Sequence, residues 1–288
     1  MLPSFKKRRI TVNNFKIVAD SSADLLSVAE VAFESVPLKI ITDEREYVDD
    51  ESLDVVGMLN DLAKYKGRSR TSCPNSEEYI KAFGDAENIF CITITSNLSG
   101  SCNAARAAAK TYMEEHPERR VHVIDSLSTG AESALIIDKL ATMIQDGMSF
   151  DEIKERITDY NDHTRLIFAL ESMHNLANNG RVSPVVAKVA GILGIRAIGR
   201  ASDVGTLEMT NKSRGVQNMV NDIVNNMISE GCKGGRIRIN HADNEAAAKL
   251  LRDKILEKIP TAEIIMGEAR GLCSFYAERG GLLIGFET

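Results

Sequence analysis

The stretch FKIVADSSADL at residues 15–25 sets the pattern for the first half of the chain. It is a short apolar run, typical of a buried strand, that ends in a polar turn of small and hydroxyl-bearing residues. The same plan returns in IFCITITSNLSGS at 89–101 and in VHVIDSLSTG at 121–130. Continuous apolar runs of this kind are typical of parallel strands covered on both faces. We therefore expect three buried strands, each followed by a hydroxyl-rich turn.

Helical patterns follow the second and third turns. Residues 103–113 are rich in alanine, and residues 132–145 place apolar side chains at helical spacing. Strand, turn and helix in repetition predict βαβ units and a mostly parallel sheet. In the less regular piece between the first two turns, Asn75 and Glu78 resemble a capping pair ahead of a helix over 77–83.

The second half does not repeat the strand–turn–helix pattern of the first half. It begins with an expected strand over 165–170. Ser183 and Pro184 are typical of the N-cap and first position of a helix, which continues over 185–193. The remaining expected elements are a hairpin over 197–209, helices over 215–229 and 244–258, strands over 236–240 and 263–266, and a terminal helix–strand pair. We predict a mostly parallel α/β domain over 14–160, an α+β domain over 161–288, and a ligand cleft between them.

Composition excludes several functions. The net charge of -6 disfavours a nucleic-acid partner, which needs a cationic surface. No apolar stretch is long enough for an integral membrane segment, and the basic run at 6–9 has no apolar region after it, so we expect no signal peptide. Five cysteines without a Cys-x-x-Cys pair fit reduced thiols in a cytoplasmic protein.

Motifs of common catalytic sites are missing from the sequence. It has no Gly-x-Ser-x-Gly elbow, no dinucleotide-binding glycine fingerprint and no phosphate-binding loop ending in Gly-Lys-Ser or Gly-Lys-Thr. The five histidines are scattered, and the acidic run at 43–51 lacks the spacing and glycine of a calcium loop. We therefore predict no metal, no cofactor and no catalytic residue.

The hydroxyl-rich turns predict an anion site. Turns that follow parallel strands meet at the carboxyl edge of the sheet, where helix N-termini favour a carboxylate or phosphate. Arg181 could hold such a group bidentately, or it could be an ordinary surface arginine. Helix capping is the competing explanation for the turns, because serine, threonine, aspartate and asparagine are favoured there regardless of function. The candidate ligand-binding residues of these turns and of the nearby 71–72 pair are Ser21, Thr71, Ser72, Ser96, Asn97, Ser99, Gly100 and Ser126.

Six motifs together resemble those of one known family. They are DSSADL at 20–25, TSCPNS at 71–76, SNLSGS at 96–101, IDS at 124–126, GRVS at 180–183 and KSRG at 212–215. Their order and approximate spacing are similar to those of the DegV family, over nearly the whole chain after Asn14. The resemblance implies a two-domain α/β protein that buries the acyl chain of a long-chain fatty acid in a tunnel and holds its carboxylate near the domain interface.

The resemblance also implies residue roles and a partner. Thr71 and Ser72 match the carboxylate contacts of the family's Thr-Ser-x-Pro motif, and Ser96 with Ser99 match those of its Ser-x-x-Ser-Gly motif. Arg181 matches the arginine that orders this polar end. The best understood bacterial members are the fatty-acid-binding, non-catalytic subunit of a fatty acid kinase, so a separate kinase catalytic subunit is the expected partner.

One departure from the family pattern concerns the head group. Where the family commonly has Gly-x-His-x-Gly-Pro-Gly, with its histidine on the carboxyl group, residues 267–273 place Ala269 at the histidine position. Arg270, a water molecule or a different ligand head group could compensate. The expected function is fatty acid binding. The alternatives are an enzyme or sensor for a small phosphorylated or carboxylated metabolite, and an acyl sensor that has no kinase partner.

Overall fold

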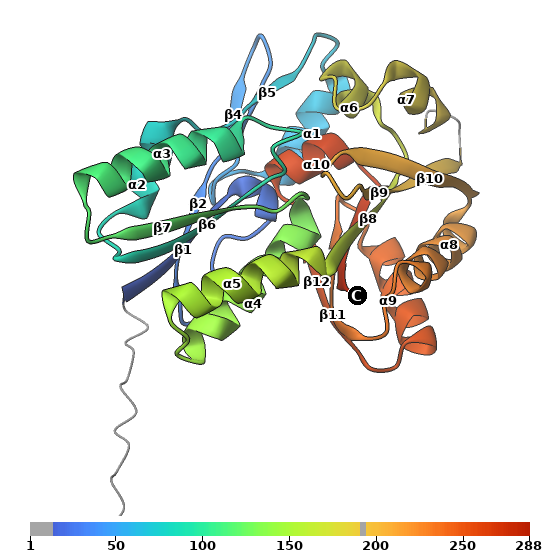
Figure 1. Ribbon diagram of the computed structural model, residues 1–288. Coiled ribbons are helices and arrows are strands. Elements are labelled where there is room, and N and C mark those ends of the chain that lie inside the picture. The colour runs from blue at the N-terminus through green and yellow to red at the C-terminus, as the bar shows by residue number, and fades with distance from the viewer. Residues whose placement is uncertain (1–13, 191–193) are drawn as a thin grey trace, which may run out of the picture.

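The computed structural model describes residues 14–190 and 194–288, which form two large sheets, a small sheet and surrounding helices (Figure 1). The strands are β1 Phe15–Asp20, β2 Ala32–Val36, β3 Lys39–Ile41, β4 Glu46–Val48, β5 Arg70–Ser72, β6 Asn88–Thr93, β7 Arg120–Asp125, β8 Thr164–Leu170, β9 Ile195–Ala201, β10 Leu207–Arg214, β11 Gly235–His241, β12 Ala262–Glu268 and β13 Leu282–Glu287. The helices are α1 Val55–Lys64, α2 Ser76–Phe83, α3 Ser101–Glu115, α4 Gly130–Gln145, α5 Phe150–Asp162, α6 His174–Asn178, α7 Pro184–Ala190, α8 Val216–Ser229, α9 Glu245–Lys258 and α10 Gly271–Ala277, with a short 3-10 turn at Ser21–Ala23.

The first sheet is parallel throughout, with strand order β2-β1-β6-β7. Alternate side chains of its strands enter two separate cores, as strand geometry requires. Val18 and Cys91 pack with α2 and α3 on one face, whereas Ile17 and Phe90 pack with α4 and α5 on the other. The predicted βαβ architecture is confirmed, and the hydroxyl-rich turns that follow β1, β6 and β7 lie at one edge of the sheet (Figure 1).

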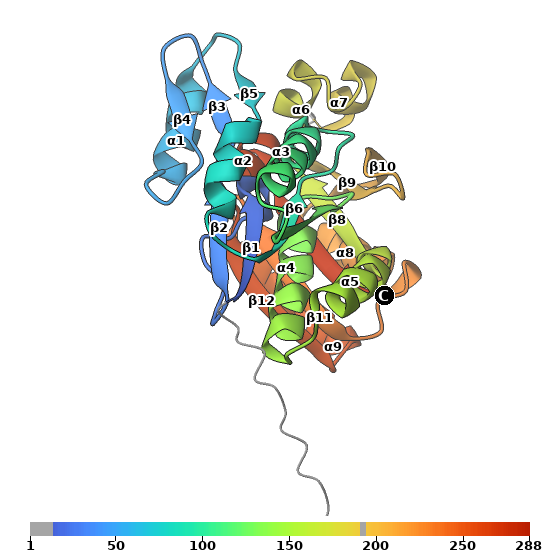
Figure 2. The same ribbon diagram turned by 60° about the vertical axis from the view of Figure 1, so that its left-hand side comes forward.

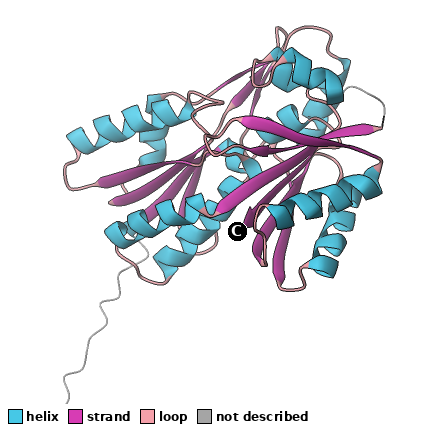
Figure 3. Ribbon diagram, turned by 45° about the vertical axis from the view of Figure 1, so that its right-hand side comes forward, coloured by secondary structure: helices cyan, strands magenta, loops and turns pink. Residues whose placement is uncertain are grey.

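The second sheet is mixed, with strand order β10-β9-β8-β13-β11-β12. Its strands pair antiparallel except for β11 and β12, which are parallel. The helices α8 and α9 cover one face through an apolar core that includes Ile167 and Ile284. The predicted hairpin is present as β9 and β10. Figure 3 shows the two large sheets as separate fans of strands.

The sequence pattern did not predict the small sheet. Three strands of three residues each pair antiparallel in the order β4-β3-β5, and α1 lies beside them, as Figure 2 shows.

The predicted capping pair ahead of α2 is confirmed: Asn75 accepts from Glu78 N, and the Glu78 side chain accepts from Asn75 N. The end of the helix predicted over 185–193 lies partly outside the described residues, and α7 is described to Ala190.

Helix α4 joins the two large sheets. It packs against β1 and β6 of the first sheet and against β11 and β13 of the second, and it is buried along most of its length. The residues of the two sheets lie on either side of the predicted boundary at 160, but the division into two domains stays a prediction. No helix within residues 14–190 and 194–288 has the length and apolar character needed to cross a membrane.

We expect Gly285→Ala to destabilise the protein. A Cβ atom at Gly285 in β13 would lie 2.5 Å from Glu132 N and 2.6 Å from the Ala131 carbonyl, so α4 would have to move away from the sheet. Overpacking of this kind costs about 1–3 kcal/mol of unfolding free energy, measurable by urea denaturation. The control is Gly267→Ala in β12, where the nearest atom is 3.7 Å away. Equal stability of the two variants would contradict the close packing of α4.

Glu132 predicts a pH dependence of stability. This carboxyl on α4 is buried, and its Oε1 accepts a hydrogen bond from Thr164 Oγ1 at 2.8 Å. Burial raises the pKa of Glu132 from 4.5 to about 7, although the hydrogen bond from Thr164 opposes the shift. Between these two values the folded protein holds a proton that the unfolded chain has lost. The free energy of unfolding therefore falls as pH rises through this window and levels off above it.

Glu132→Gln should flatten that dependence, because the amide keeps the acceptor for Thr164 but cannot ionise. Urea denaturation at pH 5 and pH 7.5 measures the slope, with the exposed Glu155→Gln as control. The parent and the control should lose more stability than Glu132→Gln over this range. An identical loss in all three proteins would contradict the assignment to Glu132.

Candidate functional site

A cavity lies between the two large sheets and is lined by residues from both halves of the chain. Its empty space, including the mouth that opens to solvent, measures about 640 Å³. One wall is β8, where Leu166, Phe168 and Leu170 face the cavity while Ile167 and Ala169 face α8 on the other side of the sheet. The other apolar lining residues are Leu38, Ile94, Leu98, Leu176, Leu207, Leu272, Ala277 and Leu283.

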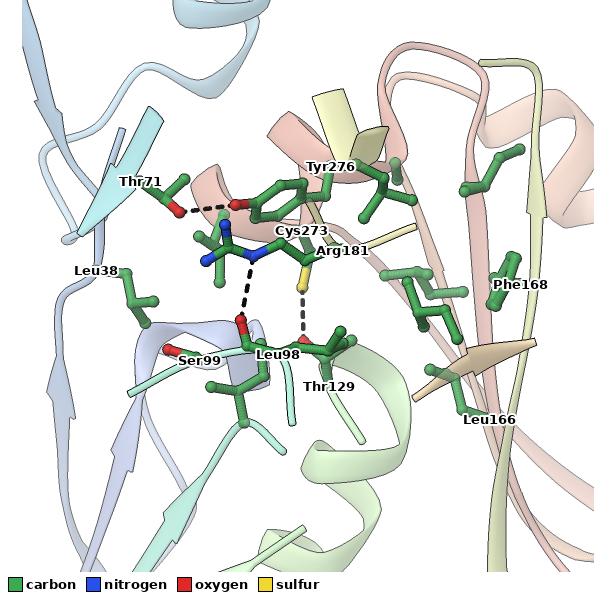
Figure 4. Close-up of a pocket in the computed structure, with 17 residues that line it drawn as sticks. Leu38, Thr71, Leu98, Ser99, Thr129, Leu166, Phe168, Arg181, Cys273 and Tyr276 are labelled. Atoms are coloured by element: carbon green, nitrogen blue, oxygen red, sulfur yellow. Dashed lines mark hydrogen bonds between the residues drawn. The ribbon is translucent and has the colours of Figure 1, made fainter. Parts of the chain in front are cut away.

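The polar groups of the cavity gather toward one end, away from Leu166 and Phe168 (Figure 4). Thr71 Oγ1 and the Tyr276 hydroxyl lie 2.7 Å apart, within hydrogen-bond distance. Arg181 donates from Nε to the Leu98 carbonyl at 3.2 Å, and its guanidinium carbon lies 5.8 Å from the centre of the Tyr276 ring. Ser99 lies beside them. Among the described lining residues, Arg181 carries the only formal charge.

Thr129 and Cys273 add a weakly polar contact to the lining. Thr129 Oγ1 lies 3.6 Å from Cys273 Sγ, which also donates to the Ser22 carbonyl at 3.3 Å. Burial raises the pKa of the Cys273 thiol well above its usual value, and the nearby Asp24 raises it further. Cys273 is therefore a neutral thiol at pH 7 and adds no charge to the cavity.

Two buried carboxylates fix the helix that carries Tyr276. Asp49 accepts from Gly271 N and Leu272 N, one on each oxygen, both at 2.8 Å. Asp24 accepts from Arg270 N at 2.8 Å. Carboxylates at this end of α10 satisfy its unpaired N–H groups and complement its partial positive charge. Since α10 supplies four lining residues of the cavity, these two carboxylates set the position of one wall.

The three turns interlock through buried polar groups. Asp20 accepts from Ile94 N at 3.0 Å and from the Ser101 hydroxyl at 2.6 Å, which ties the first turn to the second. Asp125 accepts from Ser96 N at 3.1 Å, which ties the third turn to the second. Neither α3 nor α4 has a side-chain hydrogen bond at its N-cap. The carboxylates of Asp20 and Asp125 thus hold the turns to one another, and Ser99 Oγ also accepts from Ser101 N at the start of α3 at 3.3 Å, as helix capping would predict.

The structure brings three of the predicted site residues together at the cavity, namely Thr71, Ser99 and Arg181. Arg181 also donates from Nη1 to the Asn179 carbonyl. Two backbone contacts thus hold the guanidinium of this half-buried residue at the polar end of the cavity. Their roles in binding stay predictions.

The other predicted residues lie outside the lining of this cavity. Ser21 Oγ accepts from Leu38 N at 3.0 Å, and Ser72 Oγ donates to the Cys73 carbonyl at 3.3 Å. Asn97 donates to the Val204 carbonyl, and Ser126 Oγ donates to the Ser128 carbonyl at 3.0 Å. The remaining two of these residues are Ser96, in the turn network described above, and Gly100, which precedes α3.

Arg270 and Ala269 also lie away from the cavity lining. Arg270 donates to the Asp50 carbonyl, and its Nε lies 3.9 Å from Asp49 Oδ1, so its charge faces the Asp49 carboxylate. Ala269 is buried, and its N donates to the His241 carbonyl at 2.9 Å. Neither Ala269 nor Arg270 is among the described lining residues of the cavity.

Sequence reasoning missed two polar lining residues. Thr129 lies in the third hydroxyl-rich turn, three residues after Ser126, which is the residue of that turn predicted from the sequence. Tyr276 lies outside all six motifs. The available signal was a hydroxyl-bearing aromatic residue in the otherwise small and apolar segment 271–277.

The chain is similar to known proteins along nearly its whole length. The family model of the DegV family matches residues 14–288. The chain belongs to the DegV family. A DegV domain-containing protein of Streptococcus pneumoniae is 43% identical over 277 residues, covering 95% of this chain and 99% of the relative. The resemblance and the fold class predicted from the sequence are confirmed.

Two solved structures of family members carry bound fatty acids. A DegV family protein from Eubacterium eligens, loaded with heptadecanoic acid, matches with a TM-score of 0.94 and 45% identity. The Fatty Acid Kinase (Fak) B3 protein of Streptococcus pneumoniae, loaded with linoleic acid, matches with a TM-score of 0.93 and 42% identity. Each match covers 95% of this chain and 99% of the other.

Asp49→Asn should loosen the start of α10. The substitution leaves one acceptor oxygen for two backbone N–H groups, and its amide would face one of them as a second donor. A buried donor without a partner costs about 1–3 kcal/mol, so we expect lower stability in urea and faster hydrogen exchange at Gly271 and Leu272. The control is Asp54→Asn at the N-cap of α1, where Asp54 accepts one bond, from Gly57 N. Since asparagine caps as well as aspartate, that variant should match the parent. Equal exchange in both variants would contradict the role of Asp49.

Proposed function

We propose that this DegV family member binds one long-chain fatty acid. The carboxylate occupies the end of the cavity formed by Thr71, Ser99 and Arg181, and the acyl chain extends along the leucine-rich wall of β8. One observation carries the proposal: the lining is apolar except for hydroxyls, a thiol and one guanidinium, and the guanidinium and two hydroxyls share one end. An amphiphile with an anionic head matches this distribution.

The energetics favour a long apolar ligand. Each buried methylene contributes about 0.8 kcal/mol, so the acyl chain supplies most of the affinity while the polar end fixes orientation. The fatty acids bound to the relatives from Eubacterium eligens and Streptococcus pneumoniae support the same class of ligand. A small phosphorylated metabolite would leave the leucine-rich wall without a partner.

We also propose that the protein presents its fatty acid to a separate acyl kinase and has no reaction of its own. The similarity to the FakB3 protein of a fatty acid kinase supports the partnership. The polar end offers donors to an anion, but among the described lining residues it has no carboxylate or imidazole that could act as a base. The five cysteines are all free thiols, which supports a cytoplasmic location.

Mass spectrometry of an organic extract of the purified protein tests the ligand class. We expect a stoichiometric long-chain fatty acid, and the delipidated protein should bind heptadecanoic acid. An empty protein that binds neither this acid nor linoleic acid, but does bind a phosphorylated metabolite, would overturn the proposal. Adding a candidate acyl kinase, ATP and heptadecanoic acid, and assaying acyl phosphate, tests the partnership separately.

Arg181→Lys should weaken the binding of heptadecanoic acid about five- to tenfold. Lysine keeps the charge but loses the planar fork, and its single ammonium cannot hold the Leu98 and Asn179 carbonyls and a carboxylate together. Isothermal titration of the delipidated proteins measures the change, with the exposed Arg279→Lys as control. Unchanged affinity in Arg181→Lys would remove this residue from the head-group site.

A further inference from the structure

Tyr276 lies where a ligand head group would lie, although no sequence motif pointed to it. Its hydroxyl comes from α10, and its partner, the Thr71 hydroxyl, comes from β5, 205 residues earlier in the chain. Both side chains line the cavity and point toward one another in Figure 4, beside the Arg181 guanidinium. The pair therefore sits at the junction of the two halves of the chain, at the polar end of the cavity.

A count of protons shows what this pair can do. Each hydroxyl carries one proton, and the single hydrogen bond between them uses one of the two. Within residues 14–190 and 194–288, neither hydroxyl has a second hydrogen-bond partner in the protein. Whichever of the two donates, the other keeps an O–H proton for a further acceptor. The pair thus has one O–H donor left over, which no described group of the protein accepts.

The surroundings select an anionic acceptor. Arg181 lies over the Tyr276 ring and supplies positive charge, and no carboxylate is among the described lining residues of the cavity. Burial raises the pKa of Tyr276, outweighing the opposing effects of Thr71 and Arg181, so the phenol keeps its proton at neutral pH. A neutral hydroxyl beside a guanidinium favours a carboxylate oxygen over a neutral group.

The donor is also held in place before a ligand arrives. The Tyr276 ring packs edge-on against Phe275 with ring centres 4.8 Å apart, and α10 is fixed at its start by Asp49. Thr71 is held by the pairing of β5 with Ile40 in β3. Both oxygens therefore need little reorganisation on binding, and a preorganised donor loses little entropy when it meets its acceptor.

We infer that Tyr276 is a head-group-binding residue, and that its hydroxyl and that of Thr71 act as one unit that donates a single hydrogen bond to the ligand carboxylate. This inference rests on the proposed function and adds a residue to it. It also makes the site selective: the acid should bind more tightly than its uncharged ester, because hydrogen bonds to charged groups are about twice as strong as neutral ones.

Tyr276→Phe removes the hydroxyl and keeps the ring. For the delipidated protein, isothermal titration should show heptadecanoic acid binding about tenfold more weakly than to the parent, and methyl heptadecanoate changing less than about threefold. The matched control is Tyr112→Phe, whose hydroxyl donates to the Gly84 carbonyl at 2.8 Å, in the α2–α3 core. It should leave both affinities unchanged. Equal losses for acid and ester in Tyr276→Phe, or no loss for either, would overturn the inference.

Thr71→Val removes the other hydroxyl of the pair. It provides a second measurement of acid binding if Tyr276→Phe folds poorly. If each hydroxyl must be oriented by the other to reach the carboxylate, either substitution removes the donated bond, so the double variant should bind the acid about as weakly as whichever single variant binds it less tightly. Additive losses would overturn the shared donor. If the parent itself bound no fatty acid, the proposed function would fail together with this inference; if the parent bound and Tyr276→Phe bound equally well, only the inference would fail.

Discussion

The hydrogen bonds between Asp49 and the first turn of α10 hold the site together. Ionised carboxylates are costly to bury, and burial raises the pKa of both Asp49 and its neighbour Asp24. The cost is offset by backbone N–H groups that would otherwise lack partners at the start of a buried helix. Because Asp24 and Asp49 belong to the first half of the chain and α10 to the second, this contact also aligns the two halves around the cavity.

The cavity itself follows from the alternation of a single strand. One row of β8 side chains completes the core under α8, so the opposite row must find a different partner. Leu166, Phe168 and Leu170 form that row and face the space between the sheets. A globular fold would usually fill such a space with its own side chains. Here the leucine-rich wall lines a cavity whose polar groups lie at the other end, which is the distribution on which the proposed function rests.

Much of the fold could be predicted because long elements carry periodic signals. The strands β1, β6 and β7 are continuous apolar runs, and their turns meet at one edge as parallel pairing requires. The strands of the small sheet have three residues each, too few to show a period, so they could not be recognised. Hydrogen bonds to Asp24 and Asp49 fix the position of α10. These partners lie more than 220 residues away in the chain, so no local sequence pattern predicts them.

The site was predicted in part for a related reason. The sequence marks which turns carry hydroxyls but not where each hydroxyl points, since that depends on side-chain rotamers and on neighbours from other elements. Thr71 and Ser99 face the cavity, whereas Ser21 accepts from Leu38 N and Ser126 bonds within its own turn. Tyr276 could not be predicted, because the sequence of a short apolar helix does not distinguish a core tyrosine from one whose hydroxyl has a partner in a cavity.

The position of β13 has a consequence for synthesis on the ribosome. This strand is made after every other, yet it lies in the interior of its sheet, between β8 and β11. The residues of α10 that complete the cavity are made just before it. A nascent chain can form its parallel sheet early, but the leucine-rich wall of β8 stays uncovered until residues 271–287 emerge. The leucines of β8 lack their partners from residues 271–287 during that interval, so this apolar surface is prone to aggregation until the last strand has formed.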